Sequence, residues 1–470
     1  MGGSVRRETT SWLHVSAHRY LTRRLECALL GGDYRTVEGS RRTRLISLTF
    51  GCVLTVVAIA GCGLLSLLQP QSGLGDARIA MGRVSGALYV RVGDTWHPVL
   101  NLASARLIAA SDANPQPVRE SDLLSAKHGP LLGIPGAPQL LAPPLPVRQS
   151  AWTICDGGGD AGTTVLIGPP AGPSVAALAA DRAILVTTDS DSQAYLLYHG
   201  SRALVDLADS AVVRALGLSG QRPRTVSRSL LGAVPEAPPI AVPRVAKAAG
   251  PPRAWLPETP VGTVLRITRA GGDEFYVVLT AGVQRIGQLT ADLLRFHDSQ
   301  GSADVVTISP DALRQAPEVD ILPTAGFPER APALSVGDSD ICVVWTPVPA
   351  GPAEITVGTG SARGLSAGGR AATLAQADGR GPAVDAVYLP PGHSAYVSAQ
   401  GLTGIGARSL PRFLVTDAGV RFAIHDDEAA RDLGLPSTAA PAPWALLAAL
   451  PCGPELSRAK ASVGRDTVGP

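Results

Sequence analysis

The chain has 470 residues, which at about 150 residues per domain predicts roughly three structural units and excludes one small fold. Its 41 basic and 39 acidic residues leave a formal charge of +2, so it lacks the basic surplus that drives binding to nucleic acid. Gly and Pro are frequent, at 52 and 40 residues, without a Gly-X-Y period, so the chain is turn-rich but not collagen-like.

The N-terminal segment predicts an amphipathic basic helix over residues 12–30. Apolar residues recur at helical spacing from Leu13 to Ala28, and three arginines occupy other faces: Arg19, Arg23 and Arg24. Such a helix lies on anionic lipid or packs against a partner at the cytoplasmic face. His14 and His18 share one face, but zinc needs three or four protein ligands, so we predict no metal site.

Residues 45–68 predict a membrane-spanning helix, because about 24 consecutive residues carry neither charge nor proline. At 1.5 Å per residue they reach about 36 Å, against a hydrocarbon core of about 30 Å. The alternatives are a buried core helix, which is rarely apolar on every face, and a signal peptide. A signal peptide has a shorter apolar region after a short basic head, whereas 44 residues precede this one.

Charge predicts the orientation of this span. Residues 1–44 contain nine arginines against four acidic residues, and basic residues near a span stay in the cytoplasm. We therefore expect a single-pass protein of the inner (plasma) membrane with its N-terminus in the cytoplasm. The bulk of the chain, from residue 69, is then periplasmic.

Beyond the span, four stretches share one pattern: strand, tight turn, strand, capping residue and helix. They cover residues 88–108, 195–218, 276–295 and 413–435. One such unit cannot bury its own apolar face, so the copies are expected to stack or to surround a shared core. Proline-rich pieces such as PQPVRES, VPEAPPIAVP and APAPW are interpreted as rigid connectors between units.

Cys155 and Cys342 each lie in a short apolar run beside a tryptophan, as expected for two core strands. In an oxidising compartment such strands are joined by a disulfide, and the alternative is two separate buried thiols. Both runs fall between repeats, which predicts a central domain assembled from two distant stretches. Cys452, near the C-terminus, is the odd cysteine.

The predicted fold class is α+β: a single transmembrane helix followed by an extracytoplasmic domain of about four strand–strand–helix repeats around a central mixed or β domain. The predicted boundaries are 1–44 for the cytoplasmic segment, 45–68 for the transmembrane helix, 69–147 for the first repeat, 148–190 with 335–400 for the central domain, 191–334 for the second and third repeats, 401–440 for the fourth, and 441–470 for a C-terminal tail.

The sequence offers no catalytic constellation. A nucleotide-binding P-loop needs Gly-Lys-Ser/Thr, and none of the three lysines follows a glycine. The stretches Gly358–Gly364 and Asp156–Asp160 are interpreted as loops, because the first lacks the third glycine of a dinucleotide motif and the second clusters too few calcium ligands. We therefore predict no catalytic residue, no cofactor and no metal.

Several long motifs, in the same order, resemble the EccB family of membrane components of the actinobacterial type VII (ESX) secretion system. They are HRYLTRRLE (18–26), SGALYVRVGDTWHPVLNLASARLIA (85–109), GPLLGIPGAP (129–138), WTICD (152–156) and DDEAARDLGL (426–435). The resemblance implies an anchored protein whose outer repeats surround a central domain held by a Cys155–Cys342 disulfide. It also implies assembly with an FtsK-like ATPase and other membrane subunits. Cys452 departs from the family pattern.

The function expected from this resemblance is that of a structural membrane subunit that scaffolds the extracytoplasmic side of the secretion complex and self-associates. Family members are sometimes labelled ATPases, so an ATP-hydrolysing component is the first alternative. A cell-wall-binding module is the second, and it would require an exposed aromatic groove in a chain with only 4% aromatic residues.

Overall fold

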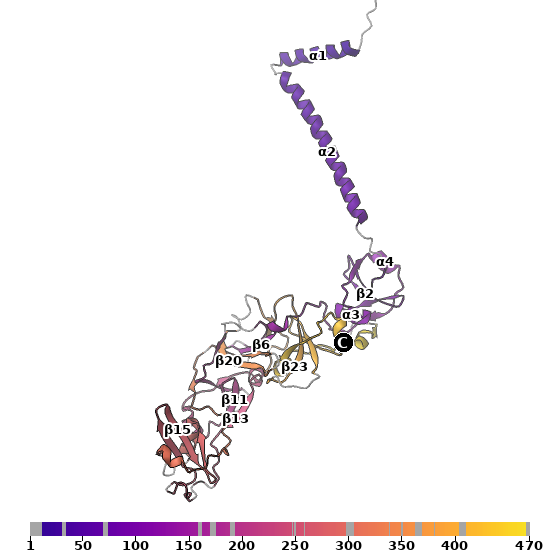
Figure 1. Ribbon diagram of the computed structural model, residues 1–470. Helices are drawn as coiled ribbons and strands as arrows, with labels where there is room; N and C mark the ends of the chain where they lie inside the picture. The colour runs from indigo at the N-terminus through magenta and orange to yellow at the C-terminus, as the bar shows by residue number, and fades with distance from the viewer. Residues whose placement is uncertain are drawn as a thin grey trace, which may run out of the picture. The chain divides into compact units, whose positions relative to one another are not determined.

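The computed structural model describes residues 12–30, 34–68, 74–157, 162–169, 175–188, 193–246, 248, 251–257, 259–297, 305–337, 339–348, 351–361, 369–379, 381–403 and 410–466 (Figure 1). The chain divides into two compact units, Met1–Gly73 and Leu74–Pro470, and each is described by itself.

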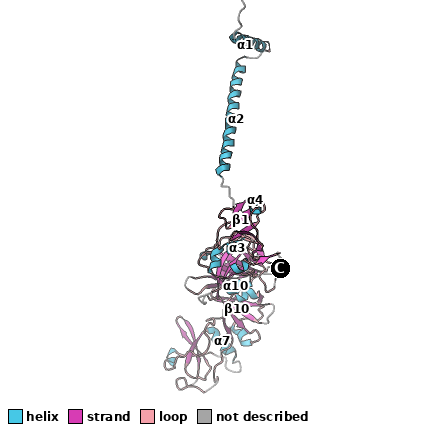
Figure 2. Ribbon diagram, turned by 90° about the vertical axis from the view of Figure 1, so that its right-hand side faces the viewer, coloured by secondary structure: helices cyan, strands magenta, loops and turns pink. Residues whose placement is uncertain are grey.

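The N-terminal unit consists of two helices, α1 (Trp12–Leu29) and α2 (Tyr34–Leu68), both drawn as helices in Figure 2. Helix α2 has 35 residues and continues without a break through the apolar stretch, which begins at its twelfth residue. The window Leu45–Cys62 has a mean hydropathy of 2.3, and none of it is buried. By length and composition, α2 is therefore able to cross a membrane.

The centre of the outer unit is a seven-stranded sheet with the strand order β21-β22-β7-β6-β19-β20-β8. Its strands come from two distant stretches of the chain. The first stretch supplies β6 (Ala151–Asp156), β7 (Thr163–Gly168) and β8 (Val175–Ala177), after the short 3-10 helix η1 (Val147–Gln149). The second supplies β19 (Asp340–Thr346), β20 (Glu354–Gly360), β21 (Ala372–Thr373) and β22 (Ala386–Tyr388).

Four smaller sheets accompany the central sheet. We call each of them, together with its helices, a module, and number the modules 1 to 4 in chain order. Module 1 contains β1 (Ile79–Gly82), β2 (Leu88–Val92), β3 (Thr95–Val99), α3 (Leu102–Ala109), β4 (Gln116–Val118), α4 (Glu120–Leu124) and β5 (Leu131–Leu132). Module 2 contains β9 (Arg182–Thr187), β10 (Ala194–Tyr198), β11 (Ser201–Val205), α5 (Ser210–Ala215), β12 (Arg224–Thr225), α6 (Arg228–Gly232) and β13 (Glu236–Ile240), with β18 (Ala333–Leu334) beside β9.

Module 3 contains β14 (Val264–Arg269), β15 (Gly272–Val278), β16 (Val283–Ile286), α7 (Gln288–His297), β17 (Val306–Thr307) and the 3-10 helix η2 (Pro310–Leu313). Module 4 contains β23 (Ala395–Gln400), β24 (Arg412–Val415), β25 (Arg421–Ile424), α9 (Asp427–Asp432), β26 (Ala440–Pro443) and α10 (Trp444–Ala449). The chain then ends in α11 (Arg458–Ala461) and β27 (Gly464–Arg465), and β27 pairs with β5 of module 1.

All four modules share one strand order. The first three strands form an antiparallel meander, and after the helix a fourth strand pairs parallel with the first. A fifth segment then runs parallel to the third strand: β5 in module 1, β13 in module 2, Glu318 opposite Val283 in module 3, and Cys452 and Leu456 beside β25 in module 4. The predicted strand–strand–helix pattern is thus the middle of a longer unit.

The helices bring the modules together in two pairs. In modules 1 and 4, Leu107 of α3 shares a buried cluster with Ala430 of α9. In modules 2 and 3, Val212 of α5 shares another with Leu289 and Leu293 of α7. A single module has one apolar face that it cannot cover alone. Pairing buries the apolar faces of both modules against each other.

Packing joins these pairs to the central sheet. Trp152 and Ile154 on β6 lie in one large apolar cluster with Leu230 of module 2 and Leu446 of module 4. Every residue of β6 is buried, which is expected of a strand covered on both faces.

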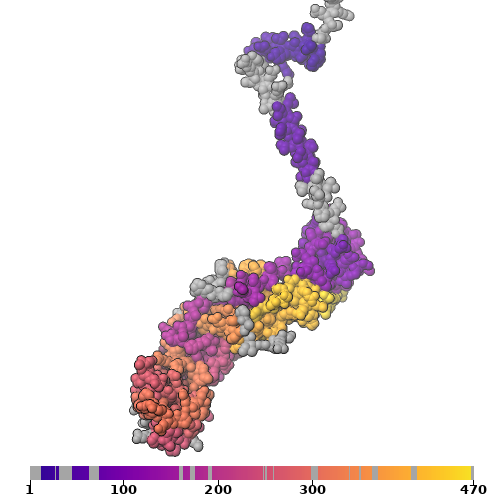
Figure 3. All heavy atoms as spheres, viewed as in Figure 1, coloured from indigo at the N-terminus to yellow at the C-terminus, as the bar shows by residue number. Residues whose placement is uncertain are grey.

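The structure differs from the sequence prediction in two places. Three proline-rich pieces interpreted as connectors contain strands β4, β13 and β26, because proline is compatible with the edge positions that these strands occupy. Residues 441–466, assigned to a tail, complete module 4 and reach module 1. Figure 3 shows the yellow C-terminal residues against the purple residues of module 1.

Candidate functional site: the anchor helices and the bridged central sheet

Helix α1 presents two different faces to its surroundings. Arg19 and Arg23 are four residues apart and so lie on one side of the helix, with Arg24 beside them, and all three side chains are exposed. The apolar side chains are exposed too: Leu13, Leu21 and Leu25 have exposed fractions of 75%, 55% and 62%. A helix with both faces uncovered requires an amphipathic surface to cover it, because leaving three leucines in water is costly.

The two histidines of α1, His14 and His18, are exposed on the helix. No group of three or more potential metal ligands occurs among the residues that the structure describes.

Helix α2 is apolar on every side over the predicted span. Its side chains from Leu45 to Ile59 include nine large apolar groups with exposed fractions between 58% and 69%. Such a surface is stable only in lipid or against other apolar helices, so α2 is a candidate membrane anchor.

The structure contains the predicted disulfide between Cys155 and Cys342. The two residues are directly opposite each other on strands β6 and β19, with Cα atoms 4.1 Å apart, and both are fully buried. Trp152 and Trp345 also face each other on these strands, three residues along from the cysteines, and both are buried. The indole Nε1 of Trp345 donates a hydrogen bond to the carbonyl of Leu402 at 2.9 Å. The bridge therefore joins the two stretches that build the central sheet.

A buried carboxylate fastens module 2 to the end of strand β6. Asp156 accepts hydrogen bonds from the amide of Ser227 at 2.6 Å and from its hydroxyl at 3.0 Å. Ser227 in turn caps helix α6 by accepting from the amide of Leu230. Burial raises the pKa of Asp156, although the bonds from Ser227 oppose the rise. The sequence analysis assigned Asp156 to a loop. The position of Ser227 directly before an apolar helix is typical of a capping residue, and it was the one sequence signal for the residue that bonds Asp156.

A second polar junction closes modules 1 and 4. Arg458 donates to the carbonyl of Leu107 at 3.1 Å and pairs with Asp432 at 2.7 Å. Glu455 lies between Lys460 at 2.7 Å and His425 at 2.9 Å, and the hydrogen bond from Lys460, followed by that from His425, lowers its pKa. These side chains hold the C-terminal segment against both modules.

None of these arrangements brings a nucleophile, a general base and an oxyanion donor together among the described residues. The arginines of α1 belong to the N-terminal unit and the disulfide to the outer unit, so the sequence-predicted residues do not form one site. Sequence reasoning missed the polar junctions at Asp156 and Glu455, because the partners Ser227 and His425 are distant in the chain.

Comparison with known proteins gives consistent matches over the whole chain. The family model described as "Type VII secretion system ESX-1, transport TM domain B" matches residues 7–470. The "ESX-3 secretion system ATPase EccB3" of Mycolicibacterium smegmatis is 35% identical over 483 residues, 99% of this chain and 93% of the relative. The "ESX-2 secretion system ATPase EccB2" of Mycobacterium tuberculosis is 36% identical over 479 residues, 96% and 94% of the two chains.

Solved structures give the same result. A chain of an intact ESX-5 inner membrane complex superposes with a TM-score of 0.73 at 32% identity, covering 99% of this chain and 98% of that chain. The EccB3 dimer from the ESX-3 core complex superposes with a TM-score of 0.71 at 35% identity, covering 83% and 100%.

Proposed function

The chain belongs to the EccB family of ESX type VII secretion systems, and from this premise we propose that it is a structural membrane subunit that scaffolds the extracytoplasmic side of a secretion complex. One observation carries the proposal: a chain solved within an intact ESX-5 inner membrane complex matches 99% of this chain, anchor helices included. Because both the helices and the outer unit of this chain have counterparts in that assembled complex, the match supports a role as a subunit of such a complex.

We infer that residues 1–44 lie in the cytoplasm and residues 69–470 in the periplasmic space. The nine arginines of the head support this orientation, and so does the disulfide, which persists in an oxidising compartment. The solved neighbour described as the periplasmic assembly of the ESX-5 inner membrane complex covers 85% of this chain, a share that fits the outer unit.

The proposed partners follow from the two exposed surfaces. The uncovered side chains of α1 support contact with lipid head groups or with a cytoplasmic partner such as an FtsK-like ATPase, because guanidinium groups bind phosphates and carboxylates. A solved neighbour described as an EccB3 dimer supports self-association of the outer unit.

We also propose that the four modules are copies of one repeat. Their shared strand order supports this, and so do their helix ends: Asn101, Asp209 and Asp426 cap α3, α5 and α9. Ala110, Gly217 and Gly434 follow the same three helices in left-handed conformations, with φ of 51°, 66° and 78°. The inserted central domain separates the copies unevenly along the chain.

The names of the relatives favour a second function, ATP hydrolysis, because they include the word ATPase. Hydrolysis requires a phosphate cradle, a metal and a positioned water. The sequence has no Gly-Lys-Ser/Thr, and ATP is scarce in the compartment proposed for the outer unit. We therefore retain the structural role as the function and treat hydrolysis as the alternative.

A cell-wall-binding module is the weaker alternative. Glycan binding of that kind relies on exposed aromatic side chains, and within the described part of residues 74–466 Trp444 alone is exposed, at 46%. Its ring is also covered on one side by the guanidinium of Arg421, 5.4 Å from the ring centroid.

The proposed role is tested by purifying the native membrane complex with an affinity tag on this chain and counting the subunits by native mass spectrometry. We expect a stoichiometric complex that contains several copies of the chain and a motor ATPase. A matched variant truncated before residue 34 retains the span but lacks α1, and it should yield less motor subunit. Recovery of the tagged chain alone, from cells that secrete normally, would overturn the proposal.

A further inference from the structure

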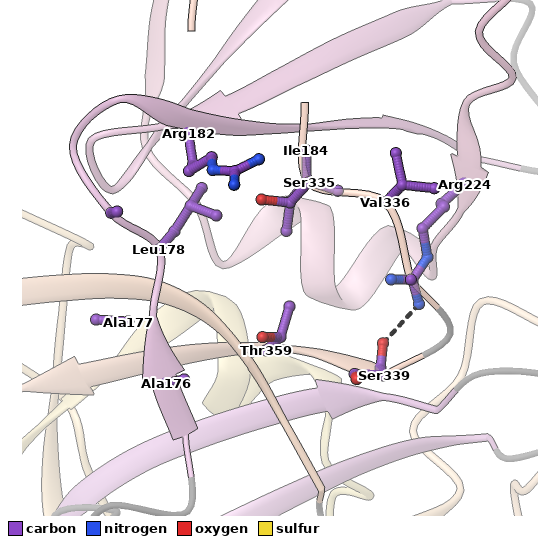
Figure 4. Close-up of a pocket in the computed structure, with 12 residues that line it drawn as sticks. Ala176, Ala177, Leu178, Arg182, Ile184, Arg224, Ser335, Val336, Ser339 and Thr359 are labelled. Atoms are coloured by element: carbon purple, nitrogen blue, oxygen red, sulfur yellow. Dashed lines mark hydrogen bonds between the residues drawn. The ribbon is translucent and has the colours of Figure 1, made fainter. Parts of the chain in front are cut away.

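Module 1 carries two of the most exposed apolar side chains of the outer unit. Among the described residues from Leu74 onward, four large apolar side chains are exposed by more than three quarters: Val84 at 90%, Val336 at 86%, Leu140 at 81% and Leu124 at 78%. Val336 borders a cavity of about 330 Å³ beside β9 and β12, as Figure 4 shows. Leu140 precedes Leu141, which packs on the cluster between α3 and module 4. Val84 and Leu124 instead lie at a different place, on the turn after β1 and on helix α4.

Hydrogen bonds fasten this turn to α4. The side chain of Glu120, the first residue of α4, accepts from the amide of Val84 at 2.8 Å and from the amide of Ser85 at 3.0 Å. Leu124 is four residues after Glu120 and so lies on the same side of the helix, one turn further along. Val84 and Leu124 therefore belong to one surface, which we call the apolar tip.

The apolar tip lies on the face of module 1 that does not meet module 4. Neighbouring residues of a strand point to opposite faces of its sheet. On β1, Ile79 packs in a cluster with residues of α3, whereas Ala80 packs in a cluster with Leu123 of α4. Figure 1 and Figure 2 show α3 and α4 at opposite ends of module 1. Because α3 is the helix that packs against α9, module 4 leaves the apolar tip uncovered.

The chain enters module 1 on this same face. Leu74, the first described residue of the outer unit, packs against the cluster that contains Leu123, and Arg91 donates to the carbonyl of Gly75 at 3.2 Å. Helix α2 ends at Leu68, and the six steps from there to Leu74 reach at most about 22 Å when fully extended. The face that carries the apolar tip is therefore tethered close to the end of the helix proposed to cross the membrane.

The surroundings of the apolar tip suit a lipid surface better than a protein surface. The charged side chains around it are of both signs, namely Arg83, Arg119 and Lys127 with Glu120 and Asp122, so attraction by charge does not select a partner. A specific protein interface buries about 800 Å² per partner, which two separate side chains do not provide.

Insertion into lipid needs no matching surface, and long basic side chains can extend to the head groups while apolar neighbours enter the acyl region. Two apolar side chains bind lipid weakly by themselves, but a short tether raises the local concentration of lipid that they meet.

We propose that Val84 and Leu124 insert into the membrane surface from which α2 emerges. The contact rests on the membrane anchor proposed above and adds a second point of attachment to it. Two attachments restrict how module 1 can turn relative to the membrane, so the copies of the chain in one complex hold their first modules in the same orientation.

The test uses the full chain in nanodiscs of phosphatidylcholine with brominated acyl chains, because bromine quenches a fluorophore only on close approach. A fluorescent label is placed on Ser121→Cys with the exposed thiols removed as Cys52→Ala, Cys62→Ala and Cys452→Ala. Ser121 is exposed and three residues before Leu124, so it reports on the apolar tip without replacing it. A label on Ser219→Cys, at an exposed turn of module 2, is the distant control.

A third protein separates this proposal from the proposed anchor. In Cys52→Ala/Cys452→Ala the label is attached in detergent to the natural Cys62 of α2, before reconstitution. Quenching at Cys62 reports that α2 is in the bilayer. An unquenched label at Cys62 would overturn the anchor and this proposal together.

We expect brominated lipid to reduce the emission of the Ser121→Cys label about twofold and to leave the Ser219→Cys label unchanged. Val84→Gln/Leu124→Gln should abolish the quenching, whereas Leu140→Gln, which removes an equally exposed leucine, should retain it. All these positions are exposed, so the variants should unfold at the wild-type temperature.

Quenching at Cys62 but not at Ser121→Cys would refute the insertion and leave the anchor intact. Equal quenching at Ser121→Cys with and without the double glutamine change would also refute it. Blue-shifted emission at Ser121→Cys without quenching would assign the apolar tip to a protein surface, such as a second copy of the chain, and would exclude lipid as its partner.

Discussion

Removing the Cys155–Cys342 disulfide should strongly destabilise the central sheet. The bridge closes a loop of 187 residues, and loop-closure entropy of this size corresponds to about 5 kcal/mol at 25 °C. Loss of a native disulfide usually costs 2–5 kcal/mol in practice, so the entropic value is an upper limit. For the outer unit, Leu74–Pro470, the unfolding entropy is roughly 0.8 kcal/mol/K, so such a loss lowers the melting temperature by roughly 2–6 °C.

The change is best made as Cys155→Ala/Cys342→Ala, since a serine would leave a buried hydroxyl group among Leu166 and Tyr388. Trp152 and Trp345 lie on the bridged strands and report their unfolding through intrinsic fluorescence. Thermal unfolding of the full chain in detergent should shift in the double variant and equally in reduced wild type. The control Cys452→Ala removes an exposed, unbridged thiol and should leave the curve unchanged.

The reasoning fails if the double variant melts within about 1 °C of the wild type, because even the smallest usual cost of a lost disulfide exceeds that shift. It also fails if both thiols are alkylated in the native, nonreduced protein. Either result would mean that the hydrogen-bonded pairing of β6 with β19, and not the bridge, determines the stability of the sheet.

Four further outcomes are expected. A reporter active only in the cytoplasm and fused at residue 200 should be inactive, and activity there would contradict the proposed orientation. The triple change Arg19→Glu/Arg23→Glu/Arg24→Glu should abolish complex recovery and secretion with the outer unit still folded, whereas Arg222→Glu should not; unchanged assembly would count against the role of the basic head. The purified chain should show no ATP hydrolysis that co-elutes with it and saturates with substrate, and such an activity, lost on a point change, would favour the enzyme. Because the pKa of Glu455 is lowered, its stabilising contribution is present above the ordinary value near 4.5 and lost as the pH falls through the lowered pKa. Hydrogen exchange of residues 457–466 should therefore accelerate in acid, and at pH 7 in Glu455→Gln; equal rates at pH 7 in variant and wild type would exclude this contact as the cause.

Local patterns made the anchor and the bridge predictable. The apolar run from residue 45 and the basic periodicity of α1 are signals within one helix, and no distant contact is needed to recognise them. The cysteines were recognisable because each lies in a strand with a tryptophan nearby, and both strands are buried. Each of these features can be recognised from residues that are close together in the sequence.

The full extent of each module was not predictable, because its fourth and fifth strands are short and pair over long distances. Strand β12 has two residues and β4 has three, too few for alternation to be seen. Strand β26 reads Ala-Pro-Ala-Pro, a composition that favours a connector unless the strand lies at a sheet edge, and β26 does. Parallel pairing of these strands with β1, β9 and β23 is determined by tertiary packing.

Module 1 directly follows the anchor, so any pull on the anchor enters the outer unit there. The contacts that resist it include the buried cluster of α3 with α9, the hydrogen bond from Arg106 to the carbonyl of Leu433, the bond from Arg458 to Leu107, and the pairing of β27 with β5. The last two involve the C-terminal segment, which therefore helps to fasten the first module to the fourth. From module 4, the shared apolar cluster continues into the bridged central sheet. Module 4 also packs directly on module 2, because Leu446 of α10 and Leu230 of α6 lie in that same cluster. The disulfide joins the two distant stretches of the sheet covalently, so a pull on module 4 cannot separate the sheet between β6 and β19.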